Sequence, residues 1–177
     1  MASFLARVRV TLGFFVGAIV FWLAQPTRDT IAIGATIAIL GESLRIWAAG
    51  HLHKSREVST SGPYSWVAHP LYLGSSVMGI GLAVASGRAI TAALIATYLA
   101  VTLSAATKTE EAFLRRTFGA SYDRYRRMDR AAVSSASVRR FSVMQVVANR
   151  EHHAVLGLAI AVLLLFLKAT YNVTFRR

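Results

Sequence analysis

Five long apolar runs alternate with short polar segments along the chain. A helix needs about 20 residues to cross the hydrocarbon core of a bilayer. We therefore expect membrane-spanning helices at about residues 8–25, 30–50, 70–86, 89–107 and 153–171. Arg7 and Arg9 precede the first run, as in a signal peptide, but no convincing small-residue cleavage site follows, so we expect this helix to stay in the mature protein.

An amphipathic segment at residues 108–127 follows the fourth run. Its aromatic and leucine side chains recur every three or four residues with arginines opposite, which is typical of a helix lying on an anionic membrane surface. These side chains are Phe113, Leu114, Phe118, Tyr122 and Tyr125. We expect Gly119 to break the segment into two helices, and residues 128–150 to form a loop or surface helix.

The pattern thus predicts an all-α fold, a polytopic transmembrane bundle of about five spans with a cytoplasmic amphipathic helical segment. Composition agrees, because 55% of the 177 residues are hydrophobic and the mean hydropathy is +0.49. The net charge of +12 need not indicate nucleic acid, since basic residues on one face of a membrane protein set its topology and meet anionic lipid. The absence of cysteine excludes disulfides, thiolate metal ligands and cysteine nucleophiles.

The distribution of basic residues predicts the orientation in the membrane. With the N-terminus in the cytoplasm, 15 Lys and Arg residues lie on the cytoplasmic side and 5 on the other. The positive-inside rule favours this arrangement. We expect an integral membrane protein of a bacterial or archaeal inner membrane.

Residues 61–74, the central motif, are the densest stretch of polar and aromatic chemistry. Gly62-Pro63 signals a turn, and Pro70 suits the first turn of a helix, so His69 is predicted at a helix entrance near the membrane surface. A residue before proline avoids the helical region, so we expect Gly62 and His69 to be extended. The plainer interpretation is a rigid interfacial elbow with headgroup-level aromatic anchors.

Three other features carry candidate chemistry. Glu42 and Arg45 lie three residues apart at the end of the second run, where they can pair. Glu110 and Glu111 lie where the fourth run leaves the membrane, on the same side as the central motif. His51 and His53 fit a solvated loop better than a metal site, so we expect no metal.

Small residues mark the third run. Gly74, Gly79 and Gly81 are either positions of close helix packing or space for a ligand against the backbone.

Four motifs, and the order in which they occur along the chain, resemble the isoprenylcysteine carboxyl methyltransferase family. That family is related to the phospholipid methyltransferases. The four motifs are Gly62-Pro63-Tyr64, His69-Pro70-Leu71-Tyr72-Leu73-Gly74, Glu110-Glu111-x-x-Leu114 and Phe118-Gly119-x-x-Tyr122-x-x-Tyr125. The resemblance covers about residues 40–127, the expected catalytic core of a single domain spanning 1–177. It implies a membrane enzyme that moves a methyl group from S-adenosylmethionine to a lipidic or isoprenoid-like acceptor at the cytoplasmic surface, leaving S-adenosylhomocysteine.

The resemblance also implies roles for individual residues. His69 and Tyr72 are the expected catalytic residues, with His69 as base if the acceptor must lose a proton. The cofactor-binding residues implied are Gly62, Tyr64, His69, Pro70, Tyr72, Glu110 and Glu111. The carboxylates are expected to accept hydrogen bonds from ribose hydroxyl groups.

The chain departs from the family pattern at two positions, where Ala68 and Ser65 replace the usual basic residues. If the missing arginine holds a substrate carboxylate, then Arg45 or Arg56 is the expected substitute, or the acceptor carries an amine, hydroxyl or thiol instead. Two other classes stay open: a catalytically silent member that binds cofactor or lipid, and a small membrane carrier. The sequence shows no internal repeat of the kind that carriers often have.

Overall fold

The computed structural model describes residues 2–53, 59–120, 122–123 and 140–175. Within this part of the chain the structure is helical, and no strand occurs. Its elements are α1 (Ala2–Leu23), α2 (Arg28–His51), the 3₁₀ helix η1 (Gly62–Ser65), α3 (Pro70–Ala85), α4 (Ala89–Phe118), α7 (Val143–Ala148) and α8 (His152–Phe175). The all-α membrane bundle predicted from the sequence is confirmed.

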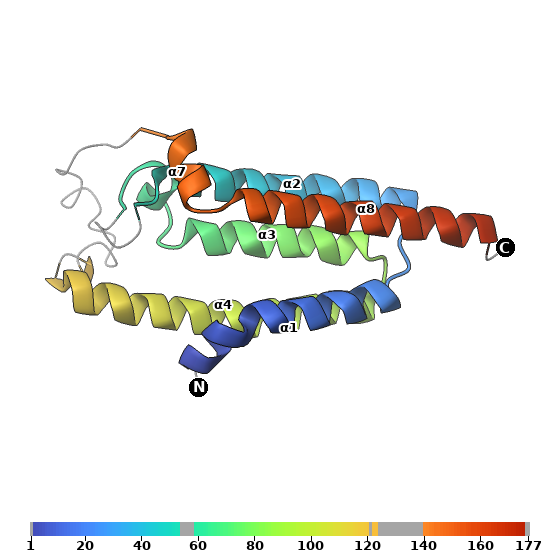
Figure 1. Ribbon diagram of the computed structural model, residues 1–177, viewed down its shortest axis with the longest axis horizontal. Helices are drawn as coiled ribbons and strands as arrows, with labels where there is room; N and C mark the ends of the chain where they lie inside the picture. The colour runs from blue at the N-terminus through green and yellow to red at the C-terminus, as the bar shows by residue number, and fades with distance from the viewer. Residues whose placement is uncertain (1, 54–58, 121, 124–139, 176–177) are drawn as a thin grey trace.

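The long helices run alongside one another and change direction at each connection (Figure 1). α3 packs between α2 and α4, α1 lies along α4, and α8 lies along α2 and α3. The C-terminal end of α2, the start of α3 and the end of α4 gather at one end of the bundle, together with α7. The candidate site residues therefore come from one end of the molecule.

Three helices are long and apolar enough to cross a membrane: Arg28–His51, Ala89–Phe118 and His152–Val173. The described residues contain two further apolar helices, Thr11–Leu23 and Pro70–Ala85, which are shorter than these three. The five predicted spans thus correspond to five apolar helices of unequal length. The first helix ends at Leu23 rather than at residue 25, and Gln25 donates its backbone N–H to the Ser86 carbonyl at 2.9 Å.

α4 differs from the expectation, because the fourth span and the first half of the amphipathic segment form one helix of 30 residues. The sequence between Ala89 and Phe118 contains neither glycine nor proline, so nothing interrupts the hydrogen-bond ladder. The helix ends where predicted, at Gly119, which has a φ of 49° that favours glycine. The glutamate pair is consequently fixed to a long straight helix rather than to a separate surface segment.

α2 and α3 approach so closely that their glycines face each other's backbone. A Cβ on Gly34 would lie 2.4 Å from the Gly81 carbonyl oxygen, and one on Gly41 would lie 2.7 Å from the Gly74 carbonyl oxygen. The two pairs are seven residues apart on both antiparallel helices. A Cβ on Gly79 would lie 2.1 Å from Leu99 on α4. Of the two interpretations of these small residues, the structure therefore favours helix packing.

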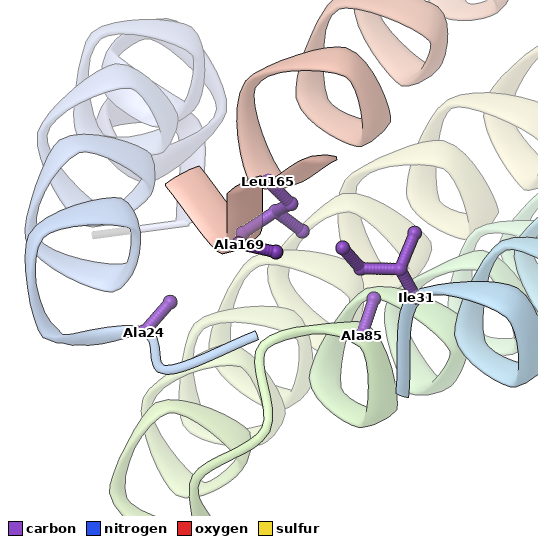
Figure 2. Close-up of a cluster of buried hydrophobic side chains, with 5 residues drawn as sticks. All are labelled: Ala24, Ile31, Ala85, Leu165 and Ala169. Carbon is purple, nitrogen blue, oxygen red and sulfur yellow. The ribbon is translucent and has the colours of Figure 1, made fainter. Parts of the chain in front are cut away.

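The end of the bundle opposite the site is closed by a small apolar cluster (Figure 2). Ala24, Ile31, Ala85, Leu165 and Ala169 are buried there, from the connection between α1 and α2 and from three helices, α2, α3 and α8. Lys168 on α8 adds a polar contact, since its Nζ donates to the Trp22 carbonyl at 2.8 Å and to the Phe21 carbonyl. This contact ties α8 to the last turn of α1, whose carbonyls have no partner within their own helix.

We predict that Gly41→Ala destabilises the protein by about 1–3 kcal/mol, because the new Cβ would lie 2.4 Å from the Met78 backbone nitrogen. Thermal unfolding in detergent measures the effect. Gly157→Ala on α8 is the matched control, since no atom lies within 4 Å of its Cβ position. A Gly41→Ala protein as stable as Gly157→Ala would contradict the close packing of α2 and α3.

Candidate active site

His69 occupies the N-cap position of α3, directly before Pro70 in the first turn. Its φ of −132° and ψ of 66° lie outside the helical region, as expected for a residue before proline, although ψ is below the extended range. Its carbonyl accepts the backbone N–H groups of Tyr72 and Leu73, both at 3.1 Å. The start of α3 thus fixes the backbone of His69, and carboxylates on α4 contact its side chain.

The imidazole of His69 lies within reach of both carboxylates of the predicted pair. Its Nε2 is 3.2 Å from Glu111 Oε1, within hydrogen-bond distance, and its Nδ1 is 3.9 Å from Glu110 Oε2. The Glu111 side chain is 18% exposed and that of Glu110 is 40% exposed. In the neutral ring that donates from Nε2 to Glu111, Nδ1 keeps the lone pair.

Tyr72 lies one turn into α3 and stacks on the His69 ring, with 5.6 Å between the ring centroids and an interplanar angle of 28°. The two rings and the two carboxylates come from the start of α3 and from the C-terminal half of α4. The structure thus brings together His69, Tyr72, Glu110 and Glu111, which are up to 42 residues apart in the chain.

Gly62, Pro63 and Tyr64 belong to η1, which precedes α3 in the chain. Pro63 and Tyr64 are buried, whereas Trp66 is 70% exposed and meets Trp47 of α2 edge-on with 5.3 Å between centroids. Gly62 was expected to be extended and instead has a φ of 58°, which glycine adopts without a steric penalty. A Cβ on Gly62 would lie 2.7 Å from the His51 ring, so this turn is packed directly on the end of α2.

Arg45 belongs to α2 and contacts α3 at Ser75 rather than at His69. The predicted pair with Glu42 is present, with 3.2 Å between Arg45 Nε and Glu42 Oε2. The guanidinium also contacts Glu151 Oε2 at 2.6 Å and donates to Ser75 Oγ on α3. Arg56, the other candidate substrate residue, lies outside the described residues, and the substrate roles of both arginines stay predictions.

Sequence reasoning missed the contribution of the segment before α8. Asn149 donates its side-chain amide to the Ala49 and Leu52 carbonyls at 2.8 and 3.0 Å, and Ser142 donates its backbone N–H to the Gly50 carbonyl at 3.1 Å. These bonds satisfy carbonyls at and just past the end of α2, where the helical hydrogen-bond ladder stops. The Ala49 carbonyl also accepts the Leu52 backbone N–H at 3.3 Å. One sequence signal was available, since Glu151 is the only acidic residue after Asp129 and stands at the start of an apolar run.

The phospholipid methyltransferase family model matches residues 8–121, which contain α1 from residue 8 onward, α2, α3, α4 and the candidate site. The chain belongs to the phospholipid methyltransferase family. The resemblance inferred from its motifs is thereby confirmed. The family region ends before α7, Glu151 and α8, so the segment that holds the end of α2 lies outside it.

Curated relatives of this family member are distant. The nickel-cobalt-cadmium resistance protein NccN of Alcaligenes xylosoxydans xylosoxydans is 32% identical over 60% of this chain and 49% of its own length. The protein-S-isoprenylcysteine O-methyltransferase of Schizosaccharomyces pombe is 32% identical over 59% and 42%, respectively. The cobalt-zinc-cadmium resistance protein CzcN of Cupriavidus metallidurans is 28% identical over 62% and 54%. The chain spans about half the length of these relatives, and no solved structure matches it.

We predict that Gly62→Ala in this family member loosens the turn before His69. The new Cβ would have to displace the His51 ring, in addition to a left-handed backbone strain of about 1–2 kcal/mol. Gly119→Ala also places an alanine at a positive φ, 49°, with no atom within 4 Å of its Cβ, so it controls for a positive-φ alanine without a side-chain clash. We expect a larger loss of thermal stability for Gly62→Ala, and equal losses would show that the contact with His51 contributes nothing.

Proposed function

We propose that the protein is an integral membrane methyltransferase that moves a methyl group from S-adenosylmethionine to a lipidic or isoprenoid-like acceptor. The observation that carries the proposal is the His69 ring lying between the carboxylates of Glu110 and Glu111 at one end of the bundle. Family membership supports the reaction class. The name of the Schizosaccharomyces pombe relative supports an acceptor with an isoprenoid tail.

The residues at the candidate site fit the cofactor. A ribose diol offers two hydroxyl donors, and carboxylates accept such bonds while also complementing the positive sulfonium. Glu110 is the better placed of the two for the ribose, because its side chain is 40% exposed and lies farther from His69 than Glu111 does. The remaining contacts are assigned to Gly62, Tyr64, Pro70 and Tyr72, as the family resemblance implies.

The residues of this chain contribute mainly alignment. Bound S-adenosylmethionine supplies an electrophilic methyl group, so the protein has no need of a nucleophile of its own. Glu111 holds the His69 ring through Nε2, which leaves Nδ1 as the acceptor for a proton when the methyl acceptor must lose one. Tyr72 limits the rotation of that ring by stacking on it. The gain in rate expected from such positioning comes from holding donor and acceptor in one reactive arrangement.

The site is proposed to face the cytoplasm. The excess of basic residues on the site-bearing side supports this orientation under the positive-inside rule. In the proposed membrane, a bacterial or archaeal inner membrane, the exposed Trp66 that follows η1 would lie at headgroup level, where tryptophan is enriched.

The chemical group that is methylated is a separate part of the proposal. Ala68 stands where the family's usual arginine would. If that arginine holds a substrate carboxylate, the acceptor is either a carboxylate held by another residue, such as Arg45 or Arg56, or an amine, hydroxyl or thiol on a lipid tail. Among the described residues, no group of three or more His, Cys, Asp or Glu is suited to hold a metal ion.

We predict saturable binding of S-adenosylmethionine and S-adenosylhomocysteine by calorimetric titration of the purified protein. Glu110→Ala and Glu111→Ala are each expected to weaken binding at least tenfold, through loss of a charge-assisted hydrogen bond or of the His69 orientation. Asp29→Ala, an exposed acid at the other end of α2, is the matched control. A folded protein that binds neither compound, even with lipid present, would contradict the methyltransferase proposal and favour a non-enzymatic membrane protein such as a carrier.

We predict that His69→Asn reduces methyl transfer by about 10²–10⁴-fold if the acceptor loses a proton, with a smaller effect on cofactor affinity. Incorporation of labelled methyl from S-adenosylmethionine into extracted membrane lipid measures the rate. A wild-type protein that binds cofactor but transfers no methyl group would favour the silent family member. An unchanged rate in His69→Asn would show that this histidine takes no part in the reaction and would favour a purely structural role in the turn before α3.

A further inference from the structure

The contacts of Arg45 form a four-residue cluster that joins three parts of the chain. Arg45 and Glu42 lie on α2, Ser75 lies on α3, and Glu151 lies between α7 and α8. The 2.6 Å distance between Arg45 Nη2 and Glu151 Oε2 spans 106 residues of sequence. We call these four residues the Arg45 cluster.

Charge balance alone does not explain Glu151. Glu42 already provides one carboxylate for the one guanidinium, so Glu151 is a second acid beside the same cation. Both acids are buried, with Glu42 4% and Glu151 6% exposed. Within the described part of the chain, neither carboxylate oxygen of Glu42 receives a hydrogen bond. Burying a further carboxylate costs free energy, so a contribution to net stability is a weak reason for its presence.

The backbone beside Glu151 is also unfavourable. Arg150 has a φ of 61°, the only positive φ at a non-glycine residue among those described. A left-handed conformation at such a residue is uncommon and costs free energy. Placing this carboxylate on Arg45 therefore costs free energy twice, through the buried charge of Glu151 and through the left-handed backbone of Arg150.

The Arg45 cluster contacts the first two turns of α3, the helix whose N-cap residue is His69. Ser75 accepts from Arg45 and donates to the Leu71 carbonyl at 2.9 Å. Gly74, its neighbour, lies against the Arg45 side chain, where a Cβ would be 2.6 Å from Cγ. Because α3 is a single helix, any slide or rotation at Ser75 would move His69 and Tyr72 relative to Glu110 and Glu111 on α4.

We infer that Glu151 is a positioning residue, which fixes the start of α3 through Arg45 and Ser75 and thereby sets the placement of His69 against α4. The inference rests on the proposed function for its catalytic meaning. It assigns a role in the site to a segment that lies outside the matched family region of residues 8–121.

Two substitutions separate positioning from folding. Glu151→Gln keeps an oxygen that accepts from Arg45 and is expected to behave like the wild type. Glu151→Leu removes this acceptor but leaves Arg45 paired with Glu42. We therefore expect Glu151→Leu to retain the melting temperature within a few degrees and to bind S-adenosylhomocysteine about tenfold more weakly, since small misplacements at a site have large effects.

The geometry is measured without the cofactor by pulsed electron paramagnetic resonance on the full chain. The sequence contains no cysteine, so spin labels at Leu73→Cys on α3 and Phe113→Cys on α4 are specific. Both positions are about half exposed, at 45% and 48%. We expect Glu151→Leu to shift or broaden the distance distribution between them, and Glu151→Gln to leave it unchanged.

Lys168→Met is the matched control, because it removes a polar contact of α8 at the far end of the bundle. It is expected to leave the labelled distance unchanged. An unchanged distance in Glu151→Leu would overturn the inference, as would a change of equal size in Lys168→Met.

If Glu151→Leu does not fold, then Glu151→Asp, which is one methylene shorter, takes its place under the same criteria. If the wild type fails to bind S-adenosylhomocysteine, the proposed function fails while the distance measurement still decides the role of Glu151.

Discussion

The close approach of α2 and α3 is the constraint on which the rest of the structure depends. In a lipid environment, apolar side chains gain little by leaving the solvent, so helices associate mainly through packing contacts and polar bonds. Gly34 and Gly41 meet Gly81 and Gly74 with no room for a side chain between the backbones. This contact fixes the register of α3, and the start of α3 carries His69. The position of the candidate site therefore follows from a helix contact that extends the length of the bundle.

The continuity of α4 is the second requirement. Glu110 and Glu111 belong to the same helix as the apolar residues that pack on α3 and α1, because nothing between Ala89 and Phe118 interrupts it. Their carboxylates are consequently held at a set distance from His69 rather than on a mobile surface segment. A helix is a more precise support for a site than a loop is, and both halves of this site rest on helices.

The polar residues of α3 are divided between two of its sides. His69 faces carboxylates of α4, whereas Ser75 meets Arg45 of α2 and, through it, Glu151. The C-terminal segment adds to this second side by hydrogen-bonding the last carbonyls of α2 through Asn149. The four helices of the family region and the segment beyond it thus form one connected structure, in which the start of α3 is held from both directions.

The sequence by itself determined the helices, most of their ends and the order of the family motifs. These features depend on near neighbours in the chain: apolar runs of sufficient length, Pro70 at a helix start, Gly119 at a helix end, and Glu42 three residues before Arg45. Only the tertiary structure decided that the glycines of α3 serve packing and that Glu151 reaches Arg45. Those outcomes depend on which helix lies beside which, and a contact across 106 residues leaves no periodic signal in the sequence.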